Sequence, residues 1–161
     1  MRRGAISHQS RPPHVDYQAL ADLRYQVRRF LRTREVAARA AGVAPQQYVL
    51  LLQVKGLDGR EPATIRALAE RLQTQHHAVV QLVDRLAARA MVVRRRDVRD
   101  RREVLVELRP AGEAVLRRLA GHSVAELRTE GPALVSSLTR LVRKSSDDRT
   151  PLRTKRKGGV R

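Results

Sequence analysis

Apolar residues recur at intervals of three and four along most of this 161-residue chain, which is the spacing of amphipathic helices. The pattern predicts a long helix over residues 16–41, ended by Gly42, and a second helix that begins at Pro45 and ends at Gly56. Residues 58–62, Asp-Gly-Arg-Glu-Pro, have the composition of a turn. The first third of the chain is therefore expected to be helical.

Two shorter helices are predicted at 64–72 and 76–89, with only three polar residues between them. Each has one apolar face, formed by Ile65, Leu68, Ala69 and Leu72 in the first and by Val79, Leu82, Val83 and Leu86 in the second. Two amphipathic helices joined by so short a link predict a helix-turn-helix, to which we assign Thr64, as a cap, and Arg66 as supporting residues.

The outward face of the second of these helices is polar at its N-terminal end. It carries Gln75, His76, His77, Val80 and Gln81, with Asp84 one turn further on. Polar side chains in this position of a helix-turn-helix are placed to meet base edges in the major groove of double-stranded DNA. An ordinary helical hairpin with a solvated face is the alternative.

Short β-type runs at 92–93 and 104–108 flank a turn loaded with charge. Between Arg94 and Arg102 there are six arginines and only two aspartates. A hairpin tipped with guanidinium groups suits insertion into a DNA groove, because arginine is attracted to the negative potential of a narrow minor groove. A solvated loop is the alternative, but the preceding helix-turn-helix favours DNA binding.

The C-terminal third is predicted to be helical again. Pro110 opens a helix that we expect Gly131-Pro132 to break, and a last helix then ends near residue 142. Residues 1–15 are interpreted as a flexible basic arm and residues 143–161, with a net charge of +6, as a disordered basic tail. The tail's charge fits either nonspecific attraction to phosphate or a solubilising end. One domain is expected between them, over 16–142.

Residues 16–142 resemble the MarR family of winged helix-turn-helix transcriptional regulators. The residues that carry the resemblance are Leu-Ala-Glu-Arg-Leu at 68–72, Leu-Val-Asp-Arg-Leu at 82–86, Asp-Val-Arg-Asp-Arg-Arg at 97–102 and Val-Leu-Val-Glu-Leu-Arg-Pro-Ala-Gly at 104–112. The resemblance implies a mainly α fold with a small β-wing and with N- and C-terminal dimerisation helices. Where this chain has Gln81, the family often has arginine, and glutamine prefers adenine to guanine.

The resemblance also implies roles in the wing and a switch. Arg99 would enter the minor groove, and Asp97 would hold the wing's shape by pairing with Arg101 or Arg102. Together with these residues, Arg94, Arg95 and Arg96 are expected to contact the DNA backbone. A small aromatic or phenolic effector, held between the dimerisation helices and the DNA-binding lobe, would change the spacing of the recognition helices and release a repressor from DNA.

The terminal helices carry more apolar surface than one compact winged helix needs to bury, and unburied apolar stripes usually find a partner. We therefore expect a two-fold homodimer on a near-palindromic operator, with the recognition helices about one DNA turn, roughly 34 Å, apart. Packing of these helices within one chain is the alternative.

Composition supports a polyanion as partner, because the formal net charge is +18. No apolar stretch approaches the roughly 20 residues of a spanning helix, and no apolar signal-peptide core follows Met1. The chain has no cysteine, which fits a reducing cytoplasm and excludes disulfides and thiol-based redox sensing. Only 2% of the residues are aromatic, which argues against single-strand and RNA binders that stack bases on aromatic side chains.

We expect neither catalysis nor a bound metal. The sequence has no phosphate-binding loop, dinucleotide-binding turn or nucleophile motif. His76 and His77 are helix neighbours that point about 100° apart and so do not easily chelate one ion. Two other functions stay open: an architectural, nucleoid-type DNA-binding protein without an effector switch, and a protein-interaction scaffold with an incidental basic surface.

Overall fold

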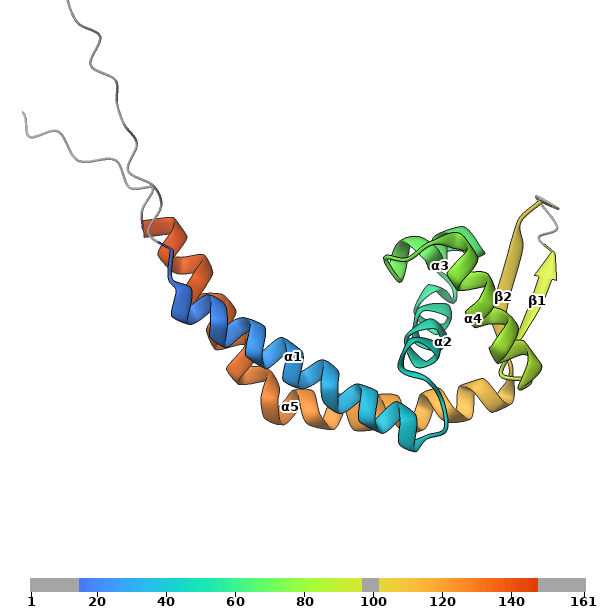
Figure 1. The fold of residues 1–161 in the computed structure, drawn as a ribbon, viewed down its shortest axis with the longest axis horizontal. Coiled ribbons are helices and arrows are strands. Elements are labelled where there is room, and N and C mark those ends of the chain that lie inside the picture. The colour runs from blue at the N-terminus through green and yellow to red at the C-terminus, as the bar shows by residue number, and fades with distance from the viewer. Residues whose placement is uncertain (1–14, 97–101, 148–161) are drawn as a thin grey trace, which may run out of the picture. The chain divides into compact units, whose positions relative to one another are not determined.

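The computed structural model describes residues 15–96 and 102–147. The predictions for residues 1–14, for Asp97, Arg99 and Arg101, and for the tail beyond residue 147 lie outside the described residues. The elements follow in the order α1 (Tyr17–Ala40), α2 (Pro45–Leu57), α3 (Ile65–Arg71), α4 (His76–Ala88), β1 (Val92–Arg96), β2 (Val104–Leu108) and α5 (Pro110–Asp147) (Figure 1). The prediction of a mainly helical fold with a small β-wing is confirmed.

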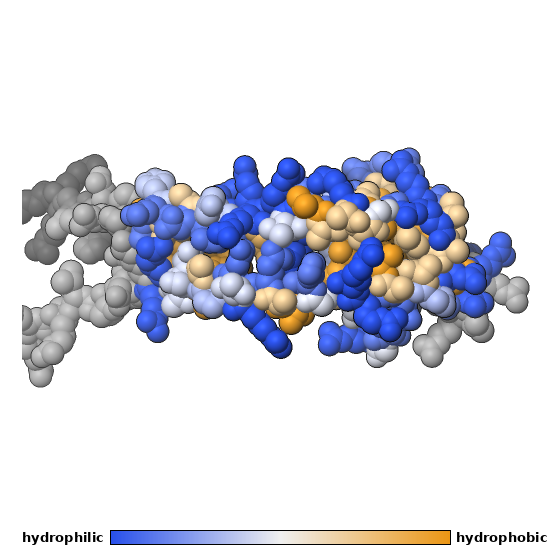
Figure 2. All heavy atoms as spheres, turned by 90° about the horizontal axis from the view of Figure 1, so that it is seen from below, coloured by the Kyte–Doolittle hydropathy of each residue, from blue (hydrophilic) through white to orange (hydrophobic). Residues whose placement is uncertain are grey.

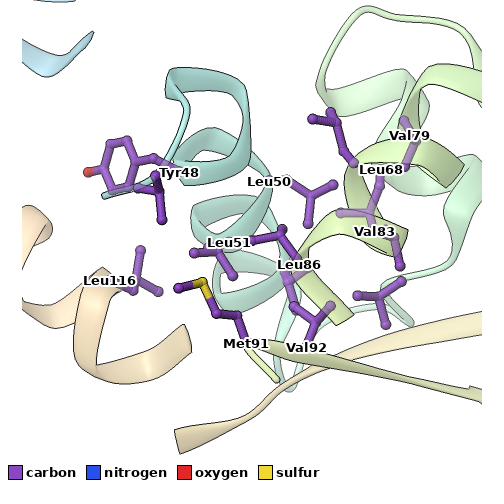
Figure 3. Close-up of a cluster of buried hydrophobic side chains, with 14 of the residues drawn as sticks. Tyr48, Leu50, Leu51, Leu68, Val79, Val83, Leu86, Met91, Val92 and Leu116 are labelled. Carbon is purple, nitrogen blue, oxygen red and sulfur yellow. The ribbon is translucent and has the colours of Figure 1, made fainter. Parts of the chain in front are cut away.

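The chain divides into two compact units, one made of residues 29–130 and the other of residues 1–28 with 131–161. Within the first unit, α2, α3, α4 and the two strands surround one apolar core (Figure 3). Its largest fully buried side chains are Leu50, Leu51, Leu57, Leu68, Val79, Val83, Leu86 and Val92. The apolar spacing that predicted the helix-turn-helix therefore corresponds to the buried faces of α3 and α4.

The helix ends follow their local sequence. Gly42 ends α1 with a left-handed φ of 77°, and its amide donates to the carbonyl of Arg39 at 2.9 Å. The Thr64 side chain caps α3 by accepting from the amide of Ala67 at 3.1 Å. The expected cap and the expected glycine stop are both confirmed.

The wing is an antiparallel hairpin in which Val92 pairs with Leu108 and Arg96 with Val104. The segment before α3 adds to it, because the Val106 amide donates to the Ala63 carbonyl at 2.9 Å and Thr64 bridges Leu105. β1 is longer than the expected run of 92–93. Its three arginines lack the composition of a strand but pair in register with Val104, Leu105 and Val106.

Gly112 lies where α5 passes close to the start of the wing. A Cβ atom at this position would sit 2.2 Å from the carbonyl oxygen of Met91. Only glycine allows the first turn of α5 to pack so closely on Met91, the residue before β1, and this contact anchors the wing to the helix that follows it.

The expected break at Gly131-Pro132 is wrong, since α5 runs as one helix from Pro110 to Asp147 with Pro132 inside it. Proline removes one helical hydrogen bond and costs roughly 3 kcal/mol. Contacts with α1 hold helical residues on both sides of it. Arg29 pairs with Glu130 at 2.7 Å in one unit, and Asp22 pairs with Arg140 at 2.9 Å in the other. α5 also ends five residues beyond the expected position 142.

In the unit of residues 1–28 and 131–161, the described residues bury few side chains. Ala19 and Ser137 are buried, whereas Tyr17 is 76% exposed and Val135 is 61% exposed. On the face drawn in Figure 2, hydrophobic areas appear between hydrophilic side chains. Tyr17 and Val135 are therefore left largely uncovered by the described part of the chain.

Candidate nucleic-acid interface

Helix α4 is fixed in the structure by its apolar face. Val79, Leu82, Val83 and Leu86 are buried, and the turn before α4 is tight enough that Gln73 takes a left-handed φ of 51°. Gln73 is held there by its side-chain amide, which donates to the Glu70 carbonyl at 2.7 Å. The opposite face of α4 is thereby directed away from the core.

The predicted base-reading residues lie on that opposite face. Gln75, His76, His77 and Gln81 are exposed, and Val80 is half-buried. Gln75 is the N-cap residue of α4, but its side chain makes no capping hydrogen bond. Amide and imidazole groups at the start of α4 are therefore accessible for hydrogen bonding to an external partner.

The three arginines of β1 differ in their surroundings. Arg94 Nη2 lies 2.7 Å from Asp84 Oδ1 of α4, and Arg95 Nε lies 2.8 Å from Glu107 Oε2 of β2. Arg96 forms no ion pair with any of residues 15–96 and 102–147. The three arginines look equivalent in the sequence, because an acidic partner on another element is not visible in the local sequence.

A groove of about 280 Å³ separates α4 from the wing. The residues that line it are Thr64, Ile65, Arg66, His76, Val80, Arg94, Arg102, Glu103 and Val104. Three arginines against one glutamate make the groove basic. Arg66 extends across it, with Nη2 3.4 Å from Glu103 Oε1.

The groove brings together predicted residues from separate segments: Thr64 and Arg66 of the α3 region, His76 and Val80 of α4, and Arg94 and Arg102 of the wing. Gln75, His77 and Gln81 do not line it. Glu103 was missed, and its only sequence signal was its place beside the arginine run. A basic groove next to an exposed row of hydrogen-bonding side chains can hold a phosphate backbone while α4 meets base edges.

A larger cavity, about 530 Å³, lies between the end of α2, the loop at 58–63, β2 and Glu113. It contains none of the predicted site residues. At its edge, hydrogen bonds from Lys55 to Asp58 and Glu113 raise the pKa of Lys55. Because none of the predicted site residues lines this cavity, we place the candidate interface at α4 and the wing rather than here.

Within the described residues, no group of three histidine, cysteine, aspartate or glutamate side chains is placed to hold a metal ion. No helix in the described part of the chain is long and apolar enough to cross a bilayer.

Comparison with known proteins adds three findings. A profile of the MarR family matches residues 41–103, which span α2, α3, α4 and the strand β1. None of the curated proteins matches the chain. Among solved structures, AbsC of Streptomyces coelicolor, a MarR family transcriptional regulator, superposes with a TM-score of 0.66 at 21% identity, covering 81% of this chain and 90% of that chain.

Two further structures connect the fold to ligands. A MepR variant of S. aureus, bound to an oligodeoxyribonucleotide, has a TM-score of 0.58 at 16% identity and covers 81% of this chain and 98% of its own. BpsR of Bordetella bronchiseptica, whose DNA binding is regulated by 6-hydroxynicotinic acid, has a TM-score of 0.59 at 23% identity and covers 85% and 99%. These three structures share the fold of this chain.

Proposed function

We propose that this chain, whose residues 41–103 match a profile of the MarR family, is a cytoplasmic, sequence-specific regulator of transcription that binds double-stranded DNA. The observation that supports this most is the exposed polar start of α4 beside the basic groove that contains Arg66, Arg94 and Arg102. Base edges supply sequence information and phosphates supply affinity, and this surface offers groups for both.

In the proposed complex, α4 enters the major groove. Gln75, His76, His77 and Gln81 meet base edges, and the half-buried Val80 presents an apolar contact of the kind that suits a thymine methyl group. Arg66, Arg96 and Arg102 face phosphates. The wing tip, with Asp97, Arg99 and Arg101, reaches the adjacent minor groove through Arg99.

We propose further that the chain acts as a homodimer on a near-palindromic operator. The support is the exposure of large apolar side chains on the terminal helices, Tyr17, Tyr25, Val135 and Leu138 among them. Burial of apolar area is worth roughly 25 cal/mol per Å², so a second copy of these helices would cover them at a gain in stability.

The proposed switch is a small aromatic or phenolic effector that releases a repressor from its operator. Regulation of BpsR by 6-hydroxynicotinic acid supports the chemical class. Within the unit of residues 29–130, Arg34 is only 11% exposed, pairs with Glu126 and lies over the Phe30 ring, 4.7 Å from its centroid. A cation beside a ring, on a helix expected to dimerise, is chemistry that suits an aromatic acid or phenol.

Footprinting of the purified full chain on DNA upstream of its own gene, with and without candidate phenolics, tests these proposals. We expect one protected region of two half-sites, lost when an active phenolic is added. Uniform coating of all DNA, unchanged by any phenolic, would instead identify an architectural protein, and no binding at moderate salt would identify a scaffold.

A further inference from the structure

The guanidinium of Arg94 contacts helix α4 at two points. Its Nη2 lies 2.7 Å from Asp84 Oδ1 and donates a hydrogen bond to the Val80 carbonyl at 3.2 Å. Arg94 belongs to β1 and both acceptors belong to α4. The contact therefore joins the wing to the recognition helix through a side chain on one element and two acceptors one turn apart on the other.

We propose that Arg94 is a positioning residue that sets the orientation of α4 for base recognition, rather than a contact to DNA phosphate. The proposal rests on the proposed function, because it assumes that α4 reads sequence. Asp84 is its partner, and we call the Arg94–Asp84–Val80 contact the wing clamp.

The place of the wing clamp along α4 supports this role. Val80 is adjacent to Gln81 in α4. Asp84 lies about one turn after Gln81, and both of these side chains are exposed. The buried side of α4 is held by apolar packing, and the wing clamp holds its exposed side. A hydrogen bond to a base edge weakens steeply with misalignment, so a small rotation at Gln81 costs discrimination between bases.

The charge of Asp84 also supports the clamp. A carboxylate on a face that meets DNA repels phosphate, so electrostatics alone would favour an uncharged residue there. Asp84 is 56% exposed and Arg94 38% exposed, so their ion pair stabilises the fold only modestly. A role of this ion pair in orienting α4 explains the carboxylate at position 84 better than its contribution to stability does.

Arg96 is a matched control for Arg94. The two lie two residues apart on β1 and so project on the same side of the strand, but Arg96 forms no ion pair with the described residues. Both changes to alanine remove one positive charge from one strand. Loss of a phosphate contact should change the salt dependence of binding, whereas loss of the clamp should change the operator preference.

Dissociation constants are measured for the full chain on its operator and on random DNA, over a range of salt concentrations. Arg96→Ala should make the slope of log affinity against log salt shallower by about 0.9 per lost phosphate contact and keep the operator preference. Arg94→Ala and Asp84→Asn should leave the slope unchanged and lower the preference by about threefold per half-site, or about tenfold on a full operator. The double variant should lose no more than either single variant.

Arg94→Lys adds a second check. It keeps the charge, but its side chain is shorter and does not carry a nitrogen as far as Nη2 of Arg94, which makes both contacts, so the clamp predicts loss of preference, whereas a phosphate contact predicts near-normal binding. An unchanged operator preference in Asp84→Asn, with a shallower slope for Arg94→Ala, would overturn the proposal.

Nitrogen-15 relaxation of the arginine Nε groups tests the clamp without DNA. In the unbound wild type, Arg94 Nε should be more ordered than Arg96 Nε, and Asp84→Asn should make Arg94 as mobile as Arg96. Equal mobility in the wild type would show that no clamp exists. Because this readout needs no operator, a clamp can be confirmed or rejected even if the chain binds no specific DNA sequence.

Discussion

The hydroxyl oxygens of Tyr48 and Ser123 lie 3.2 Å apart and join α2 to α5 within the unit of residues 29–130. Tyr48 is buried, and Ser123 also donates to the carbonyl of Leu119 at 3.0 Å. The pair connects α2, which contributes to the apolar core, with α5, which leads toward the C-terminus.

Tyr48→Phe should lower the free energy of unfolding by about 1 kcal/mol. The ring remains to fill the core, and the Ser123 hydroxyl keeps its bond to Leu119, so no buried group is left without a partner. Urea denaturation of the two proteins checks this. A loss greater than about 3 kcal/mol would show that the hydroxyl belongs to a larger network than this pair.

Two glycines of α5 should respond to alanine in opposite directions. Gly112→Ala places a Cβ against the Met91 carbonyl oxygen, 2.2 Å away, and should lower the melting temperature strongly. A Cβ at Gly121 meets nothing within 4 Å, so Gly121→Ala should stabilise α5 by up to about 1 kcal/mol. Thermal unfolding monitored by circular dichroism compares them, and equal effects would contradict the described start of α5.

The helices and their caps could be predicted from the sequence because they depend on residues that are close together in the chain. Thr64 precedes an apolar run, and Gly42 follows one, and both positions are confirmed. The break at Gly131-Pro132 could not be judged locally, since the ion pairs Arg29–Glu130 and Asp22–Arg140 join residues 101 and 118 positions apart. Partners of Arg94 and Arg95 were missed for the same reason.

The candidate interface, too, has features that the local sequence predicts and features that depend on distant contacts. Which residues of α4 face outward follows from helix periodicity, and the structure places Gln75, His76, His77 and Gln81 accordingly. The groove between α4 and the wing depends on how a hairpin packs on a helix, which periodicity does not contain. The roles in DNA contact assigned to these residues stay predictions.

Gln81→Ala should relax base preference more than it lowers affinity for random DNA, and His77→Ala should do so to a smaller extent. Removing a bidentate contact costs about 1–3 kcal/mol of discrimination at one base pair. Binding to the operator and to its single-base variants measures this. If each variant lost affinity equally for every sequence, the side chains would contact phosphate and not bases.

Deletion of residues 148–161, which begins after α5 ends at Asp147, should leave the fold and the operator preference intact. It removes six basic residues and one acidic residue, a net change of −5 per chain. Binding to random DNA should therefore weaken, and its salt dependence should become shallower by at most about 0.9 per lost phosphate contact. Loss of the folded state, seen by circular dichroism, would show that the segment is structural.

A competition titration tests whether the exposed start of α4 reads a DNA sequence. The full chain is bound to its upstream operator at moderate salt and challenged with a scrambled duplex of the same composition. We expect a preference of at least about a thousandfold for the operator, reduced sharply by Gln81→Ala. A preference near one, unchanged in that variant, would contradict this expectation and identify a protein that binds DNA by charge alone.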